Sequence, residues 1–286
     1  MLVQETNSWV VDNYITMNRT LLFLLIITSF SLFAYSDSDM DGVDDTLDQC
    51  PNTSFNELVD IKGCSTTSLL SPHHFDIIFG VENSQVNYAT LEKSDTFTQN
   101  IQLDYYYKNF SLQASTSYYN AKSKRSTDAG LNDSFLGAYY NVKPTNKLTV
   151  RIGVGIVIPT YNDAFNTNNT DYTASLNCSY ILQDINLFAG YGYTIITDDD
   201  IQNSLSYQDT NAFTAGLGLY PSKNLYISAS YSSSESIYLG VDKIKKASLY
   251  AFYNLNKNWF TNVTYSYGLS DTASDNTISL RLGYYF

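Results

Sequence analysis

The last ten residues of the chain, Thr277 to Phe286, read TISLRLGYYF. Every second residue in this stretch is apolar or aromatic, which places on one side of an extended strand Ile278, Leu280, Leu282, Tyr284 and Phe286. The opposite side carries Thr277, Ser279, Arg281, Gly283 and Tyr285. Successive side chains of a β-strand point to opposite faces, so this alternation predicts a strand with one face in an apolar medium and the other in a polar one.

The same alternation recurs upstream, in segments of about ten residues that begin near Phe75. We expect twelve strands, over residues 74–82, 97–108, 110–120, 134–142, 148–158, 171–181, 185–196, 211–220, 225–234, 244–255, 259–269 and 277–286. The five prolines of the chain lie outside these segments or at their ends, as the hydrogen-bond ladder of a sheet requires.

The connections between the segments alternate in length. The short ones are Lys108–Asn109, Lys143–Asn146, Leu182–Asp184, Pro221–Asn224 and Asn256–Asn258, whereas most of the others are longer and rich in Asp, Asn and Ser. Outer-membrane barrels have short periplasmic turns and longer outer loops, and an even strand number leaves both ends in the periplasm. The pattern therefore predicts an all-β fold, a transmembrane antiparallel up-and-down β-barrel over residues 74–286.

The polar faces indicate which side of the barrel meets water. They carry small hydroxyl and amide residues, which leave room for water: Thr98, Asn100, Gln102, Ser111, Gln113, Ser115, Thr173, Ser175, Asn177, Ser179, Ser228, Ser230 and Ser232. The chain has 26 tyrosines but only 2 tryptophans, and tyrosine settles where lipid meets water. We expect aromatic girdles at the strand ends, formed by Tyr105, Tyr107, Tyr118, Tyr193, Tyr265, Tyr267 and Trp259. The terminal Phe286 also resembles the end signature of Gram-negative outer-membrane barrels, which opposes the alternative of a soluble β-sandwich.

An export signal precedes the barrel. The apolar run Leu21–Ala34 is shorter than the roughly 20 residues of a transmembrane helix, and Arg19 supplies a positive charge before it. Cleavage after Ser36 would leave small residues at the required positions, so residues 1–36 are interpreted as upstream residues plus a signal peptide that starts at Met17. The alternative is the N-terminal helix of a soluble fold.

A calcium loop is predicted directly after this signal. Residues 37–51 read DSDMDGVDDTLDQCP, with acidic residues at alternating positions and Gly42 at the sharp turn. Calcium takes about six to eight oxygen ligands, mainly carboxylates and carbonyls. The expected ligands are Asp37, Asp39, Asp41, the carbonyl of Val43, Asp45 and, closing the loop in place of the usual Glu, Asp48. The alternative is an acidic, solvated loop.

Two cysteines close this module. Cys50 and Cys64 lie near each other in a polar segment of an exported chain, which favours a disulfide over a metal site. The bridge would close a loop of fifteen residues and contribute about 3 kcal/mol.

The pattern D-x-D-x-D-G-x-x-D-x-x-D-x-C-P, continued by Val59-Asp60 and Gly63-Cys64, resembles a thrombospondin type 3 repeat and the linker of bacterial OmpA-like proteins. The resemblance covers residues 37–64 and implies Ca²⁺ binding by the Asp residues of the loop. Only one repeat is present, so an extended row of calcium ions is not implied. Residues 65–73 are expected to link the module to the barrel.

The formal charge of −12 disfavours a nucleic-acid partner, because phosphate binding requires a basic face. Within the barrel, four charged residues are expected to face inward: Asp76, Asp104, Arg151 and Arg281. Asp104 and Arg151 lie at a similar height, each about four residues from the periplasmic end of its strand, and Asp76 and Arg281 lie on the strands that meet at barrel closure. They form either a charge-selective constriction or a salt-bridge network that plugs the lumen.

Three functions follow from this reading. The leading one is a narrow pore for small solutes or ions, between filled eight-strand barrels and open porins. The alternative is a non-conducting structural anchor whose periplasmic calcium module contacts a partner or the cell wall. An outer-membrane enzyme is disfavoured, because the histidines, His73 and His74, lie at the periplasmic foot of the first strand. Cys178 is expected on the lipid face as a small apolar residue.

Overall fold

The computed structural model describes residues 43, 48–50, 73–86, 94–124, 126–161, 168–200 and 206–286. The predicted export signal, the linker up to residue 72 and the sites Asp37, Asp39, Asp41, Asp45 and Cys64 lie outside these residues. No helix in the described residues is long and apolar enough to cross a membrane, a finding that concerns helices alone.

The described part of the barrel consists of thirteen strands. They are β1 (His73–Val86), β2 (Ser94–Tyr107), β3 (Phe110–Lys122), β4 (Thr127–Leu131), β5 (Ser134–Thr145), β6 (Leu148–Ile158), β7 (Asp171–Leu182), β8 (Ile185–Ile195), β9 (Thr210–Ser222), β10 (Leu225–Ser234), β11 (Ile244–Asn254), β12 (Trp259–Gly268) and β13 (Asn276–Tyr285).

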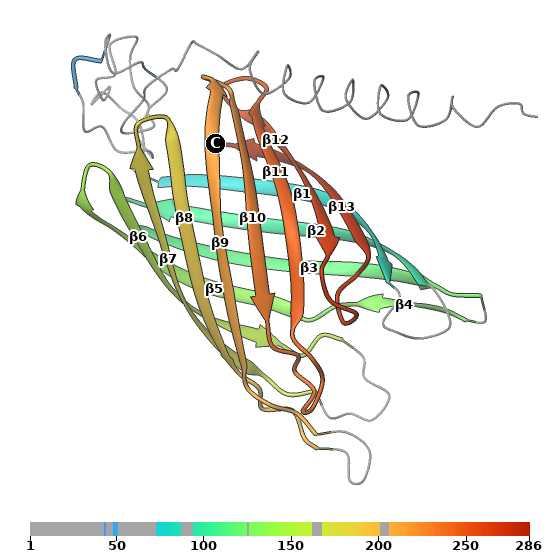
Figure 1. Cartoon of the computed structure of the whole chain (residues 1–286). Coiled ribbons are helices and arrows are strands. Elements are labelled where there is room, and N and C mark those ends of the chain that lie inside the picture. Colours follow the sequence, from blue (N-terminus) through green and yellow to red (C-terminus); the bar gives the residue numbers. More distant parts are fainter. Residues whose placement is uncertain are drawn as a thin grey trace, which may run out of the picture. The chain divides into compact units, whose positions relative to one another are not determined.

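These strands form one closed antiparallel barrel (Figure 1). Apart from β4 and β5, each strand pairs with its neighbours in sequence, and β1 pairs with β13 to close the ring, with Phe75 and Phe286 exchanging backbone hydrogen bonds of 2.8 and 3.0 Å. The short strand β4 and strand β5 both pair with β3, at its far and near ends, so together they occupy one position in the ring. The barrel therefore has twelve positions, which confirms the predicted fold and strand number.

The alternation along the strands turns the apolar faces outward. In β1, Phe75, Ile77 and Phe79 are exposed, whereas Asp76 and Ile78 between them are buried. Val154 and Leu249, in the middle of the outer wall, are each 60% exposed. A water-soluble protein would bury these side chains, so the outer surface is suited to lipid. This arrangement excludes the alternative of a soluble β-sandwich.

Aromatic residues border the apolar surface at both ends of the strands. Exposed rings near the short turns belong to Tyr107, Tyr140, Tyr253, Trp259 and Phe286, and those near the long loops to Tyr118, Tyr172, Tyr191, Tyr265 and Tyr267. These two bands correspond to the girdles expected from the sequence.

Cys178 pairs with outward-facing Val150 and Ala189 and is a free thiol on the outer wall.

The short connections lie together at one end of the barrel, and two of them are shorter than predicted. Strand β5 continues through Pro144 to Thr145, and β9 continues through Pro221 to Ser222. In both places the strand pairing shifts register, which takes the proline out of the hydrogen-bond ladder. The predicted strand ends, Val142 and Tyr220, were therefore three and two residues too early, because the irregularity accommodates the missing N–H, and both prolines still lie at the ends of their strands as expected.

Strand β4 was not predicted at all. It forms a hairpin with the end of β3, closed at Ser123–Ser126, and extends beyond the barrel wall at the end that carries the long loops. Four of its five residues, TDAGL, are exposed. Apart from Tyr119, which is buried and donates to Asp128 Oδ2, the hairpin has little buried surface, so its sequence lacks the alternation that identifies the other strands.

Candidate functional site

The barrel encloses polar space. One cavity of about 440 Å³ touches both the β1–β3 wall and the β11–β13 wall, and its lining includes Asn100, Gln102, Ser115, Asn262, Thr264 and Ser266. This volume equals that of roughly fifteen water molecules. A second cavity of about 440 Å³ lies along β5–β9, where Asn141, Arg151 and Asn177 contribute. The inner surface is therefore lined by hydrogen-bonding groups around space that water can fill.

The four predicted inward charges all lie on this inner surface. Asp76 and Asp104 are direct partners in the β1–β2 ladder and are 8% and 7% exposed. Arg281 Nη2 donates to Gln102 Oε1 at 2.5 Å, and Gln102 Nε2 donates to Asp104 Oδ2 at 2.6 Å. The amide of Gln102 thus connects a guanidinium to a carboxylate, a role that the sequence did not indicate.

Arg151 lies on the other side of this group. Its guanidinium carbon is 3.9 Å from the ring centroid of Tyr139, and its Nη2 donates to Ser111 Oγ at 3.5 Å. In the part of the chain that the structure describes, no ion pair within 4.0 Å joins the two carboxylates to the two guanidiniums. Nε of both arginines and Oδ1 of Asp76 lack a hydrogen-bond partner. The charges are therefore held apart rather than paired with each other.

Two further charges line the lumen and were missed. Glu82 pairs with the inward residues Thr98 and Ser279, and Lys246 pairs with the inward Ser232. Both positions share the period of inward residues in their own strands. Continuing the alternation along the whole of each strand would have found them.

Several inward aromatic rings lie flat against the barrel wall. Phe260 is the ladder partner of Gly283, Phe188 of Gly216, and Tyr139 of Gly153. A Cβ atom built on any of these glycines would overlap the facing ring, and the same holds for Gly218 and Tyr226. Each glycine thus leaves a notch that a ring fills, so the rings do not project across the lumen.

At the other end of the barrel, carboxylates accept hydrogen bonds from the backbone of the long loops. Asp198 Oδ1 accepts the Asn169 N–H at 2.7 Å, Asp171 Oδ1 accepts the Thr197 N–H at 2.8 Å, and Asp209 Oδ1 accepts the Ile196 N–H at 3.0 Å. The loops before β7 and β9 therefore have a defined conformation where they leave the barrel.

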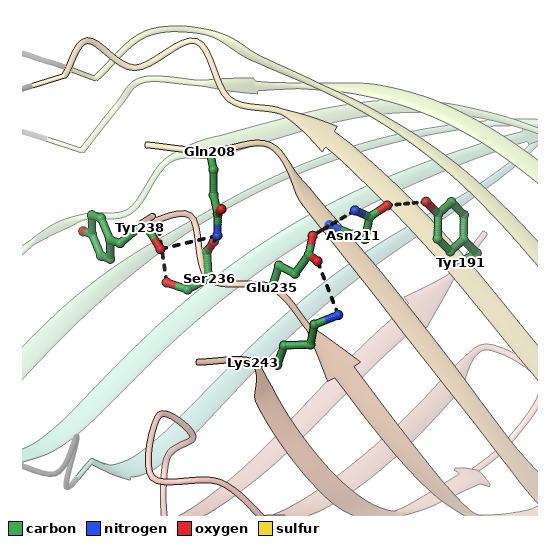
Figure 2. Close-up of polar contacts among 7 residues, drawn as sticks. All are labelled: Tyr191, Gln208, Asn211, Glu235, Ser236, Tyr238 and Lys243. Carbon is green, nitrogen blue, oxygen red and sulfur yellow. Dashed lines mark hydrogen bonds and ion pairs between the residues drawn. The ribbon is translucent and has the colours of Figure 1, made fainter. Parts of the chain in front are cut away.

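A second network fixes the loop between β10 and β11 (Figure 2). Glu235 Oε2 accepts the backbone and side-chain N–H groups of Asn211 at 3.0 and 2.8 Å, and Glu235 Oε1 lies 3.3 Å from Lys243 Nζ. These Asn211 hydrogen bonds, with the Lys243 ammonium, lower the pKa of Glu235 below its ordinary value. Gln208 Nε2 donates to the Ser236 carbonyl at 2.9 Å, which joins this loop to the segment before β9.

Of the predicted calcium ligands, the structure describes Val43 and Asp48. Asp48 Oδ1 accepts the Cys50 N–H at 2.7 Å, whereas Asp48 Oδ2 is buried and has no hydrogen-bond partner. An orphaned carboxylate oxygen of this kind fits a hard cation. The described residues hold no group of three acidic, His or Cys residues placed for a metal, but they include only one of the five predicted carboxylates.

Both histidines contact aromatic rings at the short-turn end. His73 stacks on Tyr105 and Tyr107 with centroid distances of 5.8 and 4.9 Å, and His74 stacks on Tyr285 at 5.5 Å. These contacts belong to the closure region of the barrel, where β1 meets its two neighbours.

No family model matches the chain, and no curated protein matches it. Among solved structures, the chain is similar to an outer-membrane channel from Pseudomonas putida F1, with a TM-score of 0.62 and 11% identity over 76% of this chain and 97% of the other. It is also similar to the KdgM porin, with a TM-score of 0.51 and 13% identity over 74% of this chain and 99% of the other. At these identities the likeness establishes the fold, that of an outer-membrane β-barrel.

Proposed function

We propose that the chain is a narrow channel of the bacterial outer membrane that passes small solutes or ions. The observation that carries this proposal is the contrast between the two faces of a closed barrel. The outer face exposes Leu, Ile, Val and Phe between two aromatic bands, and the inner face of strands β11–β13 and β1–β3 borders about 440 Å³ of polar space. Outer-membrane lipid is the partner of the first face and water of the second. The similar solved structures are themselves described as a channel and a porin.

The orientation in the membrane follows from the two ends of the barrel. Both His73, at the start of β1, and Phe286 lie at the end with the short turns, as antiparallel pairing of β1 and β13 requires. We assign this end to the periplasm and the long-loop end, with the hydrogen-bonded networks around Glu235 and Asp198, to the outside.

The segment before the barrel is proposed to be a periplasmic calcium-binding module over residues 37–64, closed by a Cys50–Cys64 bridge. The support is the spacing of Asp37, Asp39, Asp41, Asp45 and Asp48 in the sequence and the unpartnered Oδ2 of Asp48. Calcium would neutralise the loop's negative charge.

The alternative function is a non-conducting anchor that carries the module. The observation that favours it is the hydrogen-bonded row of Arg281, Gln102 and Asp104, which holds these polar side chains together on the inner wall. An outer-membrane enzyme has less support, because His73, whose Nδ1 lies 2.6 Å from the Tyr105 hydroxyl, and His74 both lie among tyrosine rings at the short-turn end of the barrel.

The channel is tested by the swelling of liposomes that contain the refolded protein. Migration that changes on boiling in gel electrophoresis first verifies that the barrel has folded. We expect swelling in small neutral solutes and none in solutes too large for the lumen. A folded barrel that admits no solute and conducts no ions would support the anchor instead.

A further inference from the structure

The lumen has two chemically different walls. On strands β8–β12, near the short turns, six inward rings form what we term the aromatic wall: Phe188, Tyr220, Tyr226, Tyr250, Phe252 and Phe260. Their contacts run along the wall, with ring centroids 4.8 Å apart for Tyr220 and Tyr226, 6.2 Å for Tyr226 and Tyr250, and 5.4 Å for Phe252 and Phe260. Among the inward residues of these strands only Lys246, near the long loops, is charged.

The opposite wall is built from planar hydrogen-bonding groups. In the order of pairing, β10 lies six positions from β3 in both directions around the ring, so the aromatic wall faces β1–β3. That side carries Asp76, Gln102 and Asp104, and Arg281 reaches Gln102 from β13, the strand between β12 and β1. Tyr250 of the aromatic wall and Gln102 of β2 line the same cavity, so one small molecule there would contact both walls.

The rings present a face to the lumen. Phe188, Tyr226 and Phe260 each rest on a glycine of a neighbouring strand, which occupies one face of the ring. Because these side chains are on the inner side of the barrel, we infer that the other face is directed toward the lumen. Tyr139, which rests on Gly153 in the same way, illustrates what such a face accepts, because the flat guanidinium of Arg151 stacks on it at 3.9 Å. The aromatic wall is therefore suited to stacking against a flat group.

The charges of the lumen balance. Asp76, Asp104 and Glu82 supply three negative charges, and Arg151, Arg281 and Lys246 supply three positive ones, so these six groups give no net attraction for either sign of ion. Unlike an ion, a hydroxyl group both donates and accepts, and it can satisfy a carboxylate, an amide and a guanidinium in turn. The cavity volume of about 440 Å³ lies in the range of roughly 300–1,000 Å³ that is usual for small-molecule sites.

We propose that the lumen binds neutral mono- and disaccharides, with the C–H face of a pyranose ring stacked on the aromatic wall and its hydroxyls bonded to the Asp104–Gln102–Arg281 side. This inference rests on the proposed channel function and specifies its solute. It requires the ring shape of the sugar, because an open-chain polyol carries the same hydroxyls but no flat face.

The test uses the full chain in planar bilayers and measures reversible interruption of the current by an added solute. Glucose and maltose are the probes, and sorbitol is the matched open-chain control. We expect the sugars to interrupt the current, with an affinity about tenfold higher than that of sorbitol. Glucuronate and glucosamine, which add one charge of either sign, should bind no more tightly than glucose.

Variants locate the site. Phe260→Leu and Tyr226→Leu should each lower the affinity for maltose by about fivefold, whereas Tyr226→Phe, which keeps the ring, should preserve it. Phe135→Leu is the control, because this inward ring lies at the long-loop end of β5 and outside the aromatic wall. Migration that changes on boiling verifies folding of each variant.

Each negative result would overturn a different part of the proposal. Absence of any current would overturn the proposed channel. A clear current that sugars do not interrupt would overturn the saccharide site and leave the channel standing. Equal effects of sorbitol and glucose would overturn the stacking on the aromatic wall, and markedly tighter binding of glucuronate or glucosamine would replace it with charge recognition.

Discussion

At the scale of single residues, the glycines of the inner wall determine how wide the lumen is. Gly283 leaves the space that the ring of Phe260 occupies, whereas Gly192, also inward, has no atom nearer than 3.9 Å to a built Cβ. Both glycines face inward and they differ in this contact, so they form a pair for comparison.

We predict that Gly283→Ala forces the Phe260 ring away from the wall. The substitution should destabilise the barrel by about 1–3 kcal/mol, the usual cost of overpacking, and lower the conductance because the ring turns into the lumen. Gly192→Ala should change neither quantity appreciably. The free energy of unfolding is measured by urea denaturation followed by tryptophan fluorescence, and the conductance is measured in planar bilayers. Equal effects of both substitutions would contradict the role of Gly283 in making room for the Phe260 ring.

The second prediction for single residues concerns the charged side chains of the lumen. Arg151 stacks on Tyr139 and makes no ion pair within 4.0 Å in the described structure, so removing it leaves two carboxylates against one guanidinium. Arg151→Ala should therefore shift ion selectivity toward cations and raise the conductance, and Asp104→Asn should shift selectivity toward anions. Reversal potentials in a salt gradient measure both. An unchanged reversal potential in Arg151→Ala would mean that this side chain does not border the conducting path.

At the scale of elements, the loop between β10 and β11 is held by a single carboxylate. The pKa of Glu235 lies below its ordinary value of 4.5, because Asn211 and Lys243 favour the ionised form. A depressed folded-state pKa contributes stability above the ordinary pKa, and that stability is lost as the pH falls through the folded-state value. The loop should therefore be closed near neutral pH and loosen as the pH falls below 4.5 and through the lower pKa of the folded state.

Hydrogen exchange of residues 236–242 tests this dependence. Exchange, corrected for its intrinsic pH dependence, should increase on acidification in the native chain. Glu235→Gln should exchange faster already at neutral pH and lose much of the pH response, whereas Lys243→Met, which keeps the Asn211 hydrogen bonds, should have a smaller effect. An unaltered pH response in Glu235→Gln would assign the effect to other carboxylates, such as Asp209, whose pKa is also lowered.

The strands and loops also show how much of the fold can be predicted from the sequence. Each of the twelve barrel positions was predicted, because one face of every strand meets lipid and the other meets polar space, which imposes strict alternation. Strand β4 lacks such a contrast, since four of its five residues are exposed, and the Glu235 network lies in a loop without strand alternation. Glu82 and Lys246 followed the alternation but were overlooked, whereas the Gln102 bridge depends on side-chain positions that no pattern encodes.

At the scale of the whole molecule, the barrel and the proposed calcium module should differ in their response to chelation. The module binds Ca²⁺ with an expected Kd of about 0.1–1 mM, so calcium at ten times Kd would stabilise it by about 1.4 kcal/mol. That energy is large for a small module and negligible for a closed barrel.

Limited proteolysis of the full chain should therefore separate the two parts. EDTA should expose residues 37–64 to cleavage while the barrel from Phe75 onward stays resistant, and Asp41→Ala should reproduce the effect in the presence of calcium. Cleavage of residues 37–64 at the same rate with and without calcium would reduce the module to an acidic linker.

The central claim is that a polar, continuous path runs through a barrel whose outer face is in lipid. Single-channel conductance of the purified chain in planar bilayers tests it most directly. We predict discrete openings of one small conductance that rises with salt concentration. A folded barrel that inserts into the bilayer but gives no openings would contradict the claim.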